Sequence, residues 1–82
     1  MNDLEHVSAL GNRAQHAYDS YIKDFVHNQL QEAHNAFLAC PENNTDEVMA
    51  VKRLSSALIQ LELMVLREIE EGKLARRQIE KR

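Results

Sequence analysis

The sequence predicts an all-α protein, a long antiparallel helical hairpin, on three observations. Apolar residues recur every three or four positions over two long segments, as they do along one side of an α-helix. Turn-forming residues cluster at one place, residues 40–45. The 82 residues include 2 glycines and 1 proline, too few for an all-β fold, which needs a turn every ~8–12 residues.

The first segment, residues 3–39, reads as one long helix. Asn2 stands three residues before Glu5, a pattern in which the asparagine side chain accepts a hydrogen bond from an unpaired backbone N–H at the helix start. Gly11 is the weak point, because a glycine inside a helix costs ~1 kcal/mol relative to alanine. A break near Gly11, leaving a short N-terminal arm, is the alternative to an unbroken helix.

The turn at residues 40–45 ends this helix and starts the next. Pro41 disfavours helical geometry at Cys40. Asn44 stands three residues before Glu47 and repeats the capping pattern, with Thr45 as the alternative cap. A second helix is therefore expected after the turn.

The second helix is predicted over residues 46–71. Gly72 is a candidate for the residue just beyond its end, a position that glycine often fills. Residues 1–72 then form the hairpin, and residues 73–82 form a basic tail, either a short helix or a continuation past Gly72.

The second helix has two apolar arcs when its residues are placed at 100° intervals. Ser55 and Glu62 form a narrow polar seam between the arcs. One partner helix covers an apolar stripe of ~100° or a little more, so a second surface has to cover the rest. The broad arc consists of Ala50, Val51, Leu54, Ala57, Leu58, Leu61, Met64, Val65 and Ile69, and the second arc of Val48, Ile59, Leu63 and Leu66.

This excess of apolar surface predicts self-association. A two-helix hairpin encloses no interior, and chains of this size are marginal unless they are cross-linked, bind a metal or form oligomers. The simplest solution is a homodimer that forms a four-helix bundle. We predict an oligomer interface of Val48, Ile59, Leu63 and Leu66, and a hairpin core of Leu54, Leu58, Leu61 and Val65 with Ile22 and Phe25. The 100° spacing also permits the opposite assignment, in which the second arc faces the first helix and the broad arc forms the oligomer interface.

The basic tail suggests an alternative function, nucleic-acid binding by a small regulatory protein. Residues 73–82 carry five basic side chains and one acidic one, a net charge of +4, whereas the remaining five basic and 12 acidic residues give −7. Basic side chains can neutralise phosphates, although the acidic body opposes close approach. The candidate contacts are Arg76, Arg77, Lys81 and Arg82.

Neither a metal site nor catalytic chemistry is expected, and hence no cofactor. All four histidines, His6, His16, His27 and His34, lie in the first segment, and His27 and His34 are further apart than the i, i+4 pair of zinc-binding helices. Cys40 falls at a helix C-terminus, where the helix dipole does not stabilise a thiolate. The sequence therefore predicts a non-enzymatic protein.

Several short runs in the second half carry a resemblance to known proteins. They are Ala36-Phe37-Leu38, Pro41, Lys52-Arg53-Leu54, Leu58, Leu61 and Glu71-Gly72-Lys73-Leu74-Ala75. In these runs the chain resembles small uncharacterised helical proteins of tailed bacteriophages and prophages. The resemblance implies a phage accessory or virion-assembly protein, located in the bacterial cytoplasm or the virion, with itself and other phage proteins as partners. A membrane span is not expected, because no apolar run of ~18 residues exists, and attachment to a membrane surface is not expected, because the body is acidic.

Overall fold

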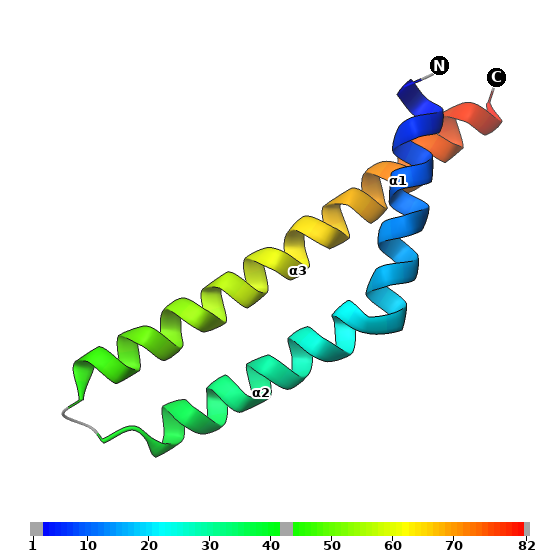
Figure 1. Cartoon of the computed structure of the whole chain (residues 1–82). Helices are drawn as coiled ribbons and strands as arrows, with labels where there is room; N and C mark the ends of the chain where they lie inside the picture. Colours follow the sequence, from blue (N-terminus) through cyan, green and yellow to red (C-terminus); the bar gives the residue numbers. More distant parts are fainter. Residues whose placement is uncertain (1–2, 42–43, 82) are drawn as a thin grey trace.

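The computed structural model describes residues 3–41 and 44–81, and every regular element within these ranges is helical. Two helices joined by a π-helical segment form the first half, and one helix forms the second (Figure 1). The all-helical fold and the long helix pair are as predicted. The bounds are Asp3–Ala17 for α1, Tyr18–Ile22 for the π-helix η1, Lys23–Ala39 for α2 and Thr45–Glu80 for α3.

The molecule is a rod built along α3. The 36 residues of α3, at about 1.5 Å each, span roughly 54 Å of a molecule whose extents are 60 × 20 × 17 Å. Figure 1 shows α2 antiparallel to α3 and α1 crossing α3 near the two chain ends. The radius of gyration is 17.7 Å, against about 12 Å for a compact domain of this length.

The turn between α2 and α3 forms as the sequence predicts. Cys40 has extended backbone angles, φ −65° and ψ 135°, and ends α2 directly before Pro41. The Asn44 side chain caps α3 by accepting a hydrogen bond from the backbone N–H of Glu47 at 3.1 Å. The corresponding cap at Asn2 lies outside the described residues.

The first half bends at η1, not at Gly11. A π-helical turn holds an extra residue, and such turns are recognised sites of helix kinks. In Figure 1 the chain changes direction where α1 gives way to α2. Gly11 lies inside α1, so the alternative of a break near it does not hold. The bend allows α1 to cross α3 while α2 runs alongside it.

Gly11 and Gly72 meet backbone to backbone where α1 crosses α3. A Cβ atom added to Gly11 would lie 2.6 Å from the Gly72 Cα, and one added to Gly72 would lie 2.6 Å from the Gly11 Cα. Side chains at these positions would push the helices apart. Of the two alternatives at Gly72, the structure has the continuation: α3 runs through Gly72 to Glu80, so residues 73–80 of the basic segment are part of it.

The hydrophobic core within one chain is thin. Among the described residues, Val26 has no accessible surface, and the other buried apolar residues retain between 3% and 8% of theirs. The core runs as a single line between α3 and the first half of the chain. Its buried apolar members are Val26, Ala33, Leu58, Ile69 and Ala75.

The predicted hairpin core is partly wrong. Leu58 is buried as expected, and Val65 and Ile22 are half-buried. Leu54, Leu61 and Phe25, however, are 49%, 44% and 39% exposed. The physical reason is that α3 turns its polar seam and the adjoining edge of the broad arc toward the first half of the chain. The far edge of the broad arc, which includes Leu54 and Leu61, is left on one flank of the contact.

Gly72→Ala tests the close crossing. We expect the substitution to lower the free energy of unfolding by about 1–3 kcal/mol, the usual cost of overpacking, even though alanine favours a helix by ~1 kcal/mol over glycine. Urea denaturation followed by circular dichroism measures the change. Ala9→Gly, at an exposed position of α1, is the control for helix propensity alone. A Gly72→Ala protein more stable than wild type would contradict the close approach.

Candidate interaction surfaces

The face of α3 that meets the first half of the chain follows a spacing of three and four residues. These positions are buried or half-buried, whereas most residues between them are exposed. Such spacing keeps one seam of a helix against a partner. The polar seam of Ser55 and Glu62 thus lies in the middle of the intrachain contact. The positions are Val48, Val51, Ser55, Leu58, Glu62, Val65, Ile69 and Gly72.

Glu62 is the centre of a polar cluster inside this contact. The Tyr18 hydroxyl donates a hydrogen bond to Glu62 Oε2 at 3.3 Å, and His27 Nε2 lies 3.1 Å from the same oxygen. The Glu62 side chain is 21% exposed and the His27 side chain 54% exposed. The cluster therefore joins η1 and α2 to the middle of α3. Sequence reasoning noted the polar seam but did not pair these residues, which are 44 and 35 positions apart.

The environment of Tyr18 disfavours its ionised form. Desolvation raises the pKa of the Tyr18 hydroxyl, and the negative charge and hydrogen bond of Glu62 raise it further. A phenolate at this position would lose the hydrogen bond that the hydroxyl donates to Glu62 and would face a like charge.

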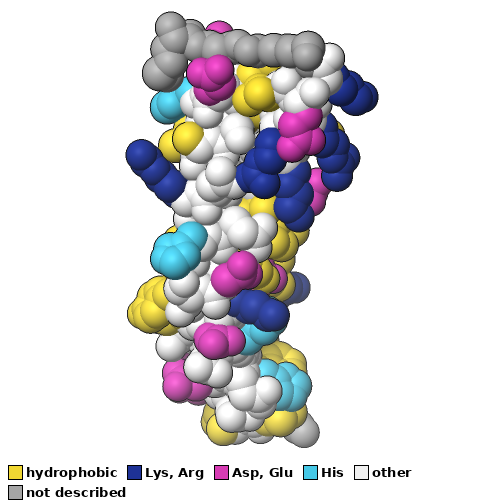
Figure 2. Space-filling view, turned by 90° about the vertical axis from the view of Figure 1, so that its right-hand side faces the viewer, with side chains coloured by type: hydrophobic (Ala, Val, Ile, Leu, Met, Phe, Trp, Pro, Cys, Tyr) yellow, Lys and Arg dark blue, Asp and Glu magenta, His cyan; other side chains and the backbone are white. Residues whose placement is uncertain are grey.

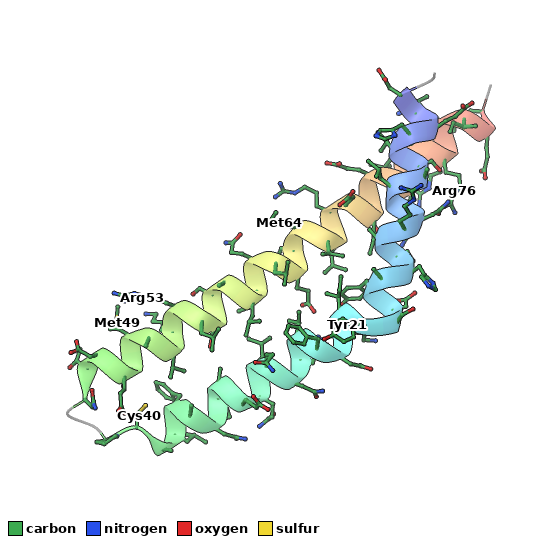
Figure 3. All side chains as sticks on the ribbon, viewed as in Figure 1. Tyr21, Cys40, Met49, Arg53, Met64 and Arg76 are labelled. Atoms are coloured by element: carbon green, nitrogen blue, oxygen red, sulfur yellow. The ribbon has the colours of Figure 1, made fainter. Side chains whose placement is uncertain are left out.

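One side of the hairpin exposes a set of large apolar residues, which we call the aromatic face. Tyr21 and Phe25 stack with their ring centroids 5.5 Å apart and an interplanar angle of 20°. At 100° per residue, Leu54 and Leu61 lie on the neighbouring flank of α3. Met64 lies further round that helix, on the side away from α2 (Figure 3). Exposures are 66% for Tyr21, 39% for Phe25, 49% for Leu54, 44% for Leu61 and 63% for Met64.

The opposite side, which we call the groove face, contains an open groove of about 580 Å³ between α2 and α3. Of the residues predicted as an oligomer interface, Ile59 and Leu63 are 47% and 51% exposed, whereas Val48 and Leu66 are half-buried. Their role as an interface stays a prediction. The groove is lined by Leu30, Ala33, His34, Phe37, Val48, Val51, Lys52 and Ser55.

The two sides are assigned from the groove residues. Leu30 and His34 both line the groove. At 100° of rotation per residue about the axis of α2, both lie on the same side of the buried residues of that helix, the side of increasing angle. At 100° per residue, Phe25 lies on the opposite side of those buried residues. On α3, the same rotation per residue places Leu54 and the groove residue Lys52 on opposite flanks of the contact with the first half of the chain. Phe25 and Leu54 therefore both lie on the aromatic face.

Basic side chains gather at the end of the molecule that holds the chain ends (Figure 2). Arg76, Arg77 and Lys81 are exposed there, and Arg82 lies outside the described residues. Lys73 pairs with Glu70 at 3.5 Å. A small cavity of about 70 Å³ beside the glycine crossing is lined by Gly11, Asn12, Gln15, Ile69, Lys73 and Arg76.

The other candidate residues stay dispersed. Within the described residues, no group of three or more His, Cys, Asp or Glu side chains is placed to hold a metal ion. The Cys40 thiol donates a hydrogen bond to the Ala36 carbonyl at 3.1 Å, a local contact at the end of α2. The four histidines are exposed.

Comparison with known proteins returned no matching family model, no matching curated protein and no matching solved structure. The helices in the described part of the chain are not long and apolar enough to cross a membrane.

Titration of Tyr18 tests the polar cluster. In a Tyr21→Phe variant Tyr18 is the remaining tyrosine of the two, and we expect its phenolate absorbance to appear above the ordinary pKa of about 10. Because the folded state holds this proton more tightly than the unfolded state, stability is present below about pH 10 and falls as the pH rises from there through the raised pKa. Adding Glu62→Gln removes the charge and should lower the midpoint. Identical midpoints with and without Glu62→Gln would show that Glu62 does not act on Tyr18.

Proposed function

We propose that this protein is a non-enzymatic assembly module that works through protein–protein contact, and that its first partner is a second copy of itself. The observation that carries the proposal is the accessible surface of 6316 Å², against about 5,050 Å² for a compact monomer of 9.5 kDa. A thin single line of buried residues leaves many large apolar side chains uncovered. Association would bury them.

The resemblance of the second half to small helical proteins of tailed phages supports a phage accessory or virion-assembly role within this proposal. A rigid helical rod with an apolar flank suits a part that joins other chains. The bacterial cytoplasm or the virion is the corresponding location.

Self-association is tested by sedimentation and light scattering over about a 100-fold range of protein concentration. We expect a species of at least twice 9.5 kDa that dissociates on dilution, and a melting temperature that rises with concentration, as mass action requires. A 9.5 kDa species with a concentration-independent melting temperature would contradict the proposal.

Nucleic-acid binding is the second candidate function. The specific observation in its favour is that α3 carries Arg76 and Arg77, and is followed directly by its C-cap residue Lys81, instead of ending before a separate tail. The net charge of −3 over the whole chain opposes it.

Electrophoretic titration with short RNA and DNA duplexes at several salt concentrations separates the two functions. The assembly proposal predicts no salt-sensitive binding. If such binding exists and Arg76→Gln, Arg77→Gln and Lys81→Gln together abolish it, the second candidate is favoured. Lys23→Gln, Lys52→Gln and Arg53→Gln together form the charge-matched control at exposed positions away from the basic end.

A further inference from the structure

The part of the aromatic face that belongs to α3 carries no charged side chain. On α3 its positions repeat at intervals of four and three residues, and all five are apolar. This spacing keeps the side chains on one stripe of about four turns. The stripe consists of Ala50, Leu54, Ala57, Leu61 and Met64, each of them exposed in the single chain.

The first half of the chain extends this stripe with aromatic rings. Tyr21 and Phe25 stack on each other across one helical turn while remaining 66% and 39% exposed. Stacked aromatic rings offer a large, rigid contact area, and such residues are enriched in the buried centres of protein interfaces. Phe25 lies on the same side of the hairpin as Leu54 and Leu61, so both helices contribute large exposed apolar side chains to this side.

The groove face has a different chemistry. Its flank of α2 carries Lys23, His27 and His34, and Lys52 of α3 lines the groove. Charged residues are depleted from the centres of interfaces because they lose hydration there. A second copy on the groove face would have to cover these groups. The α3 stripe of the aromatic face has no charged side chain, and the flank of α2 that holds Phe25 carries one, Glu32.

We infer that the aromatic face is the surface on which a second copy of this chain docks, face to face, to complete a four-helix bundle. This inference rests on the proposed self-association and names the surface responsible for it. The sequence-based prediction places the interface at Val48, Ile59, Leu63 and Leu66, on the groove side of α3, whereas we place it on the opposite side.

The available area fits one such contact. The surface exceeds that of a compact monomer by about 1,250 Å², and a standard interface buries about 800 Å² on each partner. A twofold axis would set the same stripe against itself, as in most homodimers. One face is therefore sufficient, and the groove face can remain in solvent.

Leu54→Glu and Ile59→Glu form the decisive pair of variants. Leu54 lies on the aromatic face and Ile59 on the groove flank of the same helix, and they are 49% and 47% exposed. Glutamate favours helices, so both chains should keep their helicity. We expect Leu54→Glu to weaken dimerisation by about 100-fold or more, because a twofold contact would bury two unpaired charges, and Ile59→Glu to change it by less than about threefold.

The opposite ranking, or a dimer that resists both substitutions, would overturn the choice of face and leave the assembly proposal standing. A wild-type chain that stays monomeric would overturn both. Sedimentation equilibrium of each variant measures the dissociation constants directly.

Thiol labelling gives a second measurement that does not depend on destabilising the dimer. In a Cys40→Ser background, which removes the single native cysteine, Ala57→Cys lies on the proposed interface and Ser56→Cys, its neighbour, lies outside it. We expect labelling of Ala57→Cys to slow by at least about tenfold as the concentration is raised through the dissociation constant, since the thiol becomes buried. Ser56→Cys should react at a constant rate, and equal behaviour of the two would overturn the inference.

Discussion

The contact between Gly11 and Gly72 is the constraint on which the rest of the fold depends. Because a Cβ at either position would come within 2.6 Å of the opposing Cα, the two backbones set the crossing of α1 over α3 directly. Buried Ser8 and Ala75 are also small. Once α1 is held at this crossing, the π-helical turn at Tyr18–Ile22 redirects the chain, and α2 can run antiparallel to α3.

A polar centre then decides where the apolar residues lie. Glu62 faces the first half of the chain, where Tyr18 and His27 contact its carboxylate. A helix that turns polar residues toward its neighbour presents its leucines on the two flanks. The exposure of Leu54 and Leu61 on one flank and of Ile59 on the other follows from this orientation.

The resulting rod has three chemically distinct regions. An aromatic and leucine-rich flank, a groove bordered by histidine and lysine, and a basic end lie on different parts of one rigid surface. The thin core and the apolar flank favour association with another chain over action as a lone domain. The basic end is available to a second kind of partner without competing for the flank.

The sequence by itself determined the helical periodicity, the turn at residues 40–45 and the cap at Asn44, because each depends on neighbours along the chain. It also showed that α3 has more apolar surface than one helix can cover. The roles of Gly11 and Gly72, the bend at Tyr18–Ile22 and the orientation of Glu62 were decided by tertiary structure. Each depends on contacts between residues far apart in sequence. Two glycines considered singly look like helix breakers, and only the crossing of α1 over α3 makes them the point where the two backbones approach each other.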